Sequence, residues 1–385
     1  MFNFFIPIID PSIKEWSKEA RFLRWLTFLW LFLGIIALFS ASYHSAQQDF
    51  GNGFHYIIRQ TIWIWIGLQG FNIIVKMPLK YLMKFVPFFI FFLLSLILLT
   101  KTGLGHTVNG ATRWIKIGPA IIQPSELIKP FLVLQSAYIF GFWHRHSLRI
   151  KIQWILIFSA VLAGILIQPN LSTTALCGIS LWLIALASGI PVRYLITAAA
   201  SGLSAASFSV YTHRYQLKRI LSFLDPWKDE IAKTDGYQLI QSLIAVGSGG
   251  IFGLGYGQSI QKWSYLPIHY TDFIFSVYAE EFGFIGSIFL LLLLFVYATF
   301  TLKILINCTH PVKRLIAVGS MIMMVGQALL NIGVTIGLLP TTGLPLPLWS
   351  YGGSSIIASL TLSGLLIRVI RENGEDPIVR IDKSE

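Results

Sequence analysis

Three short polar segments interrupt an otherwise apolar sequence, and each carries side chains suited to binding or chemistry. In the first, Arg113 stands beside Trp114, so a guanidinium could hold a phosphate in a bidentate contact while an indole stacks on a sugar. In the second, Glu126 precedes Lys129 by three residues, which puts both side chains on one helix face. In the third, Asp272 presents a carboxylate where a long apolar run begins.

Each segment also has a purely structural interpretation. Arg113 and Trp114 could be an aromatic anchor at the membrane surface. Glu126 and Lys129 could be a buried pair that only fixes helix packing, although ionised groups at membrane depth are costly unless they are paired or face water. Asp272, or its neighbour Thr271, could cap the following helix, and spacing alone favours the cap.

The solvent of this chain is a lipid bilayer. Apolar residues make up 55% of its 385 residues, only 12% are charged, and the mean hydropathy is +0.69. Soluble domains carry about a quarter charged residues, so the composition excludes an ordinary soluble protein and a disordered one. Cys177 and Cys308 lie far apart with no CxxC partner, so neither a disulfide framework nor a zinc site is predicted.

The length of the apolar runs predicts an all-α, polytopic membrane protein. A helix needs about 20 mostly apolar residues to cross the hydrocarbon, and about ten runs meet this length. They lie at residues 23–42, 57–75, 82–100, 119–142, 152–168, 173–190, 193–212, 276–302, 314–338 and 347–369. The chain thus divides into a tail (1–22), a transmembrane domain (23–369) and a second tail (370–385).

The basic residues predict the orientation of these runs. With the N-terminus inside, most Lys and Arg residues fall in cytoplasmic segments, whereas the short outer segments hold only Lys101, Arg113 and Lys116. Cytoplasmic loops carry an excess of Lys and Arg, so both termini are expected in the cytoplasm. The net charge of +12 is therefore a topology signal first, and no nucleic-acid partner is predicted.

A long outer loop, at about 213–275, separates the seventh and eighth runs. Structureless loops of about 60 residues are uncommon unless they are functional, so we expect chemistry there. Its glycines between Gly247 and Gly257 fit neither a GxGxxG nor a Walker spacing. We interpret that stretch as a tight re-entrant or amphipathic packing segment.

The chain resembles the SEDS family (shape, elongation, division and sporulation), the polytopic bacterial peptidoglycan glycosyltransferases typified by FtsW and RodA. The matching blocks run in the family's order over about two thirds of the chain: NGATRWI, QPSELIK, QPNLST, FLDPW, GYQLIQSLIAVGSGG, TDFIF, AEEFGFIG and GLLPTTGLPLPLWSYGGSS. The residues of these blocks are most similar to those of the division type, FtsW. Ile268 and Tyr270 stand where the family commonly has Glu and His, and Asn170 stands where many members have Asp.

The resemblance implies a lipid II polymerase. Such an enzyme transfers a disaccharide-pentapeptide between undecaprenyl-pyrophosphate-linked substrates and inverts the anomeric centre. One base must then deprotonate the attacking hydroxyl while the charged leaving group is stabilised, and we assign the base to Asp272. The residues expected at the substrate are Arg113, Trp114, Ser125, Glu126, Lys129, Arg219, Gln238, Gln241, Ser242 and Ser354.

The resemblance further implies a multi-pass protein of the bacterial inner membrane, at the division septum. Its expected partners are lipid II, membrane lipid, a class B penicillin-binding transpeptidase and the division machinery. No cofactor is implied, and a divalent cation is left open. Two other classes share these features: a flippase for lipid II or another lipid-linked carrier, and a scaffold for the transpeptidase. The long outer loop with its carboxylate favours the enzyme, since a flippase needs no outer base.

Overall fold

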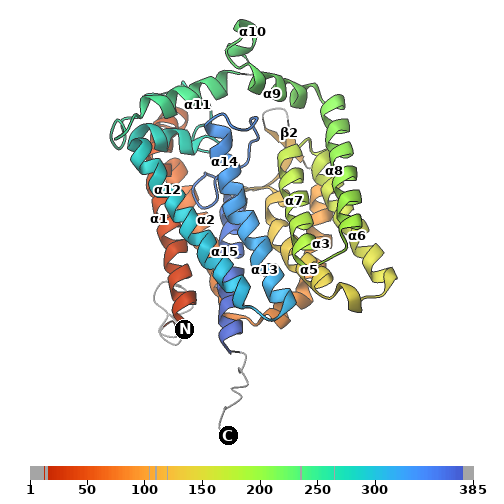
Figure 1. Ribbon diagram of the computed structural model, residues 1–385. Helices are drawn as coiled ribbons and strands as arrows, with labels where there is room; N and C mark the ends of the chain where they lie inside the picture. Colours follow the sequence, from red (N-terminus) through yellow and green to blue (C-terminus); the bar gives the residue numbers. More distant parts are fainter. Residues whose placement is uncertain are drawn as a thin grey trace.

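The computed structural model describes residues 13, 16–103, 105–108, 111–118, 120–234, 236–263 and 265–375. Long helices form a bundle, and the first long helix begins, and the last one ends, at the same end of it (Figure 1). Most of the predicted tail 1–22 and residues 376–385 of the other tail lie outside the described residues, as do Asn109 and Gly110 of the first polar motif.

Most elements follow one another with short connections, and the two long ones join α11 to α12 and α14 to α15. The first half of the chain contains α1 (Lys18–Phe50), α2 (His55–Lys76), α3 (Leu79–Leu99), β1 (Gly105–Val108), β2 (Ala111–Ile117), β3 (Ala120–Ile122), α4 (Pro124–Leu127), α5 (Lys129–Gly141), η3 (Trp143–Arg145), α6 (Leu148–Ile167) and α7 (Leu171–Ala187). The second half contains α8 (Val192–Thr212), α9 (Arg214–Leu224), α10 (Asp229–Ala232), α11 (Tyr237–Ser248), α12 (Ile274–Asn307), α13 (Pro311–Met321), η4 (Ile322–Gly326), α14 (Gln327–Thr335) and α15 (Gly353–Glu375).

The prediction of a polytopic helical membrane protein is confirmed. In the part of the chain that the structure describes, seven helices are long and apolar enough to cross a membrane. The other three predicted runs, at 57–75, 119–142 and 173–190, correspond to α2, to β3 with α4 and α5, and to the shorter apolar helix α7.

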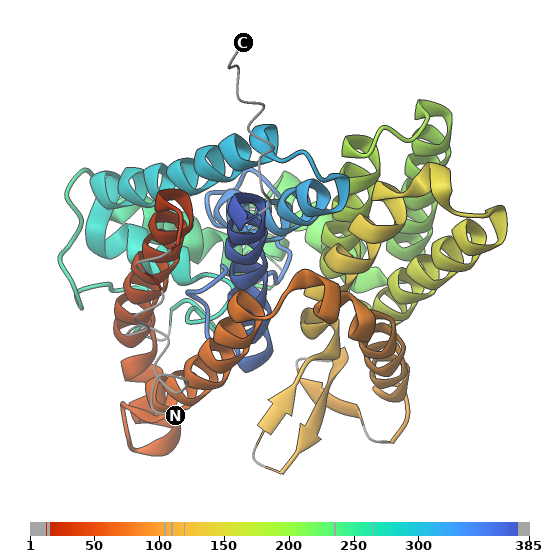
Figure 2. The same cartoon turned by 90° about the horizontal axis from the view of Figure 1, so that it is seen from below.

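A small sheet is the one departure from an all-α chain. Strands β1, β2 and β3 pair antiparallel in that order, with Trp114 opposite His106 and Ile115 opposite Ile122. The sheet lies beside α3 (Figure 2). The fourth apolar run therefore does not begin as a helix at residue 119, because a turn at Gly118 folds the chain back as β3 and Pro124 then starts α4. Proline suits the first turn of a helix, where its missing N–H costs nothing.

The predicted outer loop contains three helices in its first half, up to Ser248. Helices α9 and α11 lie across the end of the bundle opposite the start of α1, and α10 projects beyond them (Figure 1). The glycine-rich stretch packs against α12, as the packing interpretation predicts. Inside α12, Gly283 has a φ of 65°, a conformation that interrupts the helix.

The interruption in α12 is closed by backbone hydrogen bonds from the glycine-rich stretch. Leu254 and Gly255 donate their N–H groups to the carbonyls of Glu280 and Glu281 at 2.9 and 3.0 Å. In return, Phe284 donates to the carbonyl of Gly250 at 2.9 Å. Unpaired backbone groups are costly in lipid, so this segment supplies the partners that the broken helix lacks.

Candidate active site

The turn before α12 carries Asp272 and is held by its backbone. The side-chain amide of Asn331, on α14, donates to the carbonyl of Asp272 at 2.7 Å, and Ser350 Oγ donates to the carbonyl of Thr271 at 2.6 Å. The same Asn331 amide donates to the carbonyl of Leu344 at 2.8 Å. The segment at 340–350 and α14 therefore fix the position of the turn.

The cap interpretation of Asp272 is wrong. The N-cap of α12 is Phe273, and no side chain makes a capping hydrogen bond there. The carboxylate of Asp272 is thus not used by the backbone of its own helix, which removes the structural role that spacing alone favoured. The first turn of α12 instead continues from a series of turns that ends at Phe273.

The carboxylate of Asp272 and the guanidinium of Arg219 meet at Gly343. A Cβ at Gly343 would lie 3.3 Å from Asp272 Oδ2 and 3.9 Å from Arg219 Nη1. Arg219 comes from α9, where its guanidinium stacks 4.5 Å from the Tyr215 ring and donates to the carbonyl of Thr341 at 3.1 Å. Glycine at 343 has a φ of 75° and leaves room for both charged groups.

Opposing effects act on the pKa of Asp272. Burial raises the pKa above the usual value for aspartate, while the nearby guanidinium groups of Arg219 and Arg113 lower it. The charge of Glu126 raises it further. A carboxylate with a raised pKa is a stronger base, and two cations help it to stay ionised.

A cavity of about 220 Å³ is lined by Arg113 and by Arg219, the arginine that meets Asp272 at Gly343. Arg113, on β2, donates from Nε and Nη2 to the carbonyls of Gln168 and Pro169 at 3.2 and 2.6 Å. Asn170, which also lines the cavity, caps α7 by accepting from the N–H of Thr173 at 3.3 Å. Two guanidinium groups in one enclosed space favour a ligand with more than one negative charge.

Below the turn, Glu126 and Lys129 form the predicted ion pair. Lys129 Nζ lies 2.7 Å from Glu126 Oε1, and both side chains are buried. Lys129 also donates to Gln327 Oε1 at 2.9 Å, and the amide of Gln327 donates to the carbonyl of Pro345 at 2.7 Å. Through this amide, the pair is joined to the same 340–350 segment that holds Asp272.

The other sequence-predicted residues divide into two groups. Ser125 and Ser354 lie together, because Gln123 donates to Ser354 Oγ from its backbone at 2.9 Å and to Ser125 Oγ from its side chain at 3.3 Å. Ser242 is buried elsewhere, where its hydroxyl bonds Ser276 at 2.6 Å and the carbonyl of Thr335 at 2.7 Å.

Apart from Arg113 and Arg219, the residues predicted from the sequence do not line the arginine cavity. Gln238 and Gln241 are partly buried on α11, and Trp114 is partly buried on β2, next to Arg113. Successive side chains of a strand point to opposite faces, so Trp114 and Arg113 face different ways. The structure therefore brings Arg113, Arg219 and Asp272 together, and it keeps Ser242 and the two glutamines apart from them.

Sequence reasoning missed three residues of this site, namely Gln327, Asn331 and Gly343. Gln327 and Asn331 are buried amides four residues apart on α14, inside a run predicted to cross the membrane. Polar side chains at helical spacing in such a run are a usable signal, since they must find partners. Gly343 carries no comparable signal, because only the approach of two remote side chains makes a glycine necessary there.

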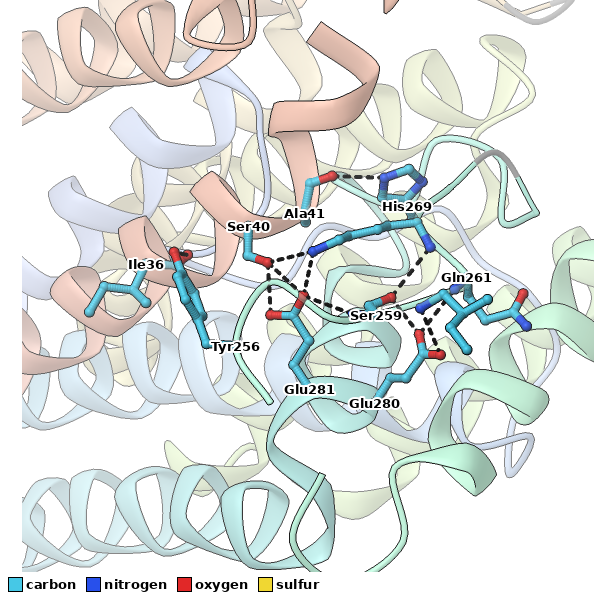
Figure 3. A network of polar contacts seen from close by, with 11 residues as sticks. Ile36, Ser40, Ala41, Tyr256, Ser259, Gln261, His269, Glu280 and Glu281 are labelled. Atoms are coloured by element: carbon cyan, nitrogen blue, oxygen red, sulfur yellow. Dashed lines mark hydrogen bonds and ion pairs between the residues drawn. The ribbon is translucent and has the colours of Figure 1, made fainter. Parts of the chain in front are cut away.

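A second polar network ties α12 to α1 and the outer loop (Figure 3). Glu281 accepts from Ser40 Oγ at 2.6 Å and forms an ion pair with Lys262 at 2.7 Å. Glu280 accepts from the Ser259 hydroxyl and from the backbone N–H groups of residues 260 and 261. All these acidic oxygens have donors, so the network fixes the loop and leaves no free carboxylate.

Among the described residues, no group of three or more His, Cys, Asp or Glu side chains is arranged to hold a metal ion. The charged side chains that the structure places at the site include those of Asp272, its two arginines and the Glu126–Lys129 pair.

Comparison with known proteins decides the family. The model of the cell cycle protein family FtsW/RodA/SpoVE matches residues 20–375. The chain belongs to this family. Among curated FtsW/RodA/SpoVE proteins, it is 53% identical to a probable peptidoglycan glycosyltransferase FtsW of Synechocystis sp., over 97% of this chain and 94% of the relative. It is 36% identical to the stage V sporulation protein E of Bacillus subtilis, over 90% and 95%.

Solved structures of the FtsW/RodA/SpoVE type share the fold. A chain from a study titled "Structural coordination of polymerization and crosslinking by a peptidoglycan synthase complex" matches with a TM-score of 0.73 and 27% identity, over 92% of this chain and 98% of that one. The crystal structure of Thermus thermophilus rod shape determining protein RodA matches with a TM-score of 0.66 and 27% identity, over 91% and 96%.

Proposed function

We propose that this chain is a peptidoglycan glycosyltransferase that polymerises lipid II, with Asp272 as the general base. The names of its FtsW relatives support the activity. One observation carries the assignment of the base. A carboxylate without a capping role lies near Arg219, and Arg219 lines a cavity together with a second guanidinium group, that of Arg113.

The proposed reaction is one inverting displacement. Asp272 accepts the proton of a sugar hydroxyl on one lipid-linked substrate as that oxygen bonds to the anomeric carbon of the other. The bond from the anomeric carbon to the pyrophosphate breaks at the same time, and its electron pair leaves with the phosphate oxygen. The leaving group gains negative charge, which the guanidinium groups of Arg113 and Arg219 stabilise.

The same residues suit the binding of the substrate. The cavity between β2, α7 and α9 offers two cations to a pyrophosphate. Trp114 packs near the sugar or the polyprenyl tail. Glu126 and Lys129 line the polar region below Asp272, where their mutual pairing offsets the cost of burying charge. Ser125 and Ser354 contribute to the same region. Gln238, Gln241 and Ser242 lie on α11, apart from the arginine cavity, and would contact the substrate only outside it.

The proposed setting is the bacterial inner membrane at the division septum, with both termini in the cytoplasm. The excess of Lys and Arg in the segments at the end of the bundle that holds the termini supports this orientation. The proposed partners are a class B penicillin-binding transpeptidase and the division machinery. The likeness to a chain from a peptidoglycan synthase complex supports such a partnership.

The decisive experiment is glycan polymerisation from purified lipid II by the purified chain, with and without its transpeptidase. Glycan strands that need Asp272 support the enzyme. Transfer of labelled lipid II between vesicle leaflets without any polymer would instead support the flippase. Activity of the transpeptidase that rises equally with wild-type chain and with Asp272→Asn would support the scaffold.

A further inference from the structure

A second and larger cavity lies at the end of the bundle that holds the chain termini. It has a volume of about 650 Å³ and lies between α3, α5, α13 and α15. Its walls are mostly apolar, with Met83 and Pro87 from α3 facing Tyr138 and Phe142 from α5. The proposed polymerase chemistry involves none of these residues. Because α3 is one of the helices that can span the membrane, the cavity borders the edge of the lipid.

The acidic residue of this cavity is already neutralised. Glu372, on α15, accepts from Arg368 Nε at 2.9 Å and from the backbone N–H of Leu79 at 2.6 Å. Lys313 Nζ lies 3.7 Å from its second carboxylate oxygen. Glu372 therefore joins α15 to the start of α3 and to α13, and it offers no charge to balance further cations.

Two lysines at the mouth remain unbalanced. Lys80 and Lys84 are four residues apart in the first turns of α3, so they lie on the same helix face. Both are exposed, and neither forms an ion pair with a residue that the structure describes. Lys84 Nζ lies 5.7 Å from the Tyr81 ring, and Lys80 and Lys84 both line the cavity. The cavity thus combines an apolar interior with a cationic entrance.

We propose that this cavity binds an anionic glycerophospholipid. Its phosphate would lie between Lys80 and Lys84, and part of an acyl chain would occupy the apolar space between α3 and α5. Basic pockets between transmembrane helices bind anionic headgroups, and the volume falls within the usual range for small-ligand sites. A free phosphate ion would satisfy the lysines but leave the apolar walls uncovered, which favours the lipid.

The test uses the full-length chain in nanodiscs of phosphatidylcholine with a small share of phosphatidylglycerol. Retained lipid is counted by native mass spectrometry after ejection. We expect the wild type to retain phosphatidylglycerol in preference to phosphatidylcholine, and Lys80→Gln with Lys84→Gln to reduce that retention about tenfold. Met83→Trp, which fills the cavity and leaves both charges, should reduce it as well.

A matched control removes the same charge nearby. Lys151→Gln with Lys303→Gln changes two lysines that do not line the cavity, and it should retain phosphatidylglycerol as the wild type does. Equal retention in the Lys80 and Lys84 variant, or an equal loss in the control, overturns the proposal. So does full displacement of the lipid by inorganic phosphate, or retention of both lipids without preference.

Discussion

Lys129 is held by Glu126 on one side and by Gln327 on the other, with its Nζ at 2.7 and 2.9 Å from their oxygens. This arrangement makes the ion pair a joint between α4, α5 and α14. The carbonyl of Pro345 accepts from the same glutamine. A change in the ion pair should therefore also affect the 340–350 segment that holds Asp272.

We expect Glu126→Gln to lower the stability of the chain. Removal of one partner of a buried pair leaves an uncompensated charge and costs about 3 to 5 kcal/mol. Thermal unfolding in detergent measures the loss, and Lys129→Met should cause a similar one. If each single variant unfolded like the wild type, the ion pair would not contribute to the stability of the chain.

Asp272→Asn should abolish polymerisation while stability stays close to that of the wild type. The carboxylate makes no capping bond, so asparagine removes little folding energy, whereas loss of a general base typically costs 100-fold or more in rate. Glycan formation from lipid II and thermal unfolding are measured on the same preparation. A variant that polymerises at nearly the wild-type rate would end the candidacy of Asp272 as the base.

Arg219→Gln should move the acid limb of the pH–rate profile to higher pH. Burial raises the pKa of Asp272, and the Arg219 guanidinium counteracts this effect. Loss of that cation raises the pKa further, so the carboxylate becomes protonated, and inactive, at a higher pH. Lys228→Gln, an exposed change on the same outer segment, serves as the control. An acid limb that stays in place in the Arg219 variant contradicts the coupling.

Arg113→Lys should weaken the use of lipid II more than it lowers stability. Its guanidinium already makes two fixed hydrogen bonds, to the carbonyls of residues 168 and 169, and a lysine cannot both keep them and reach a phosphate. The dependence of the rate on lipid II concentration measures the effect, and Trp114→Ala should impair the same step. If the rate of both variants depended on lipid II concentration as the wild-type rate does, this segment would be a surface anchor only.

The topology is tested by cysteine labelling with an impermeant reagent. A cysteine at Lys233 should react in intact cells, and one at Arg380 should react only after lysis, because the excess of basic residues predicts cytoplasmic termini. The two native cysteines, Cys177 and Cys308, are buried and give the background. Reaction at position 380 in intact cells would reverse the orientation.

Most of the helices could be predicted from sequence because each must hide its backbone from lipid, and that requirement leaves long apolar runs. The ion pair of Glu126 and Lys129 was predictable for a local reason, since three residues of helix bring the two side chains together. The sheet at 105–122 was not predictable in this way. Its short strands gain their partners through pairing, and Ala120–Ile122 reads as part of an apolar run until Gly118 is known to turn the chain.

The assembly of the site was harder to predict from the sequence than the helices were. Asp272 and Arg219 are on separate elements, and only the tertiary structure brings them to Gly343. The carboxylate itself had a local alternative, the helix cap, that spacing could not dismiss. Its rejection depends on where α12 begins, which is decided by Phe273 and the turns before it. A site that is formed by long-range contacts is thus hard to predict from the sequence alone.

The crossing of the glycine-rich stretch over Gly283 has a consequence for which substitutions the chain tolerates. The contact is made by main-chain atoms, and a Cβ at Gly253 or Gly283 would lie within 2.1 or 2.3 Å of the opposing backbone. Directly before Gly253, Ile251 and Phe252 point outward and are 62% and 81% exposed. Tolerance to substitution should therefore drop sharply within three neighbouring positions. Bulky side chains should be accepted at 251 and 252, whereas only glycine should be accepted at 253.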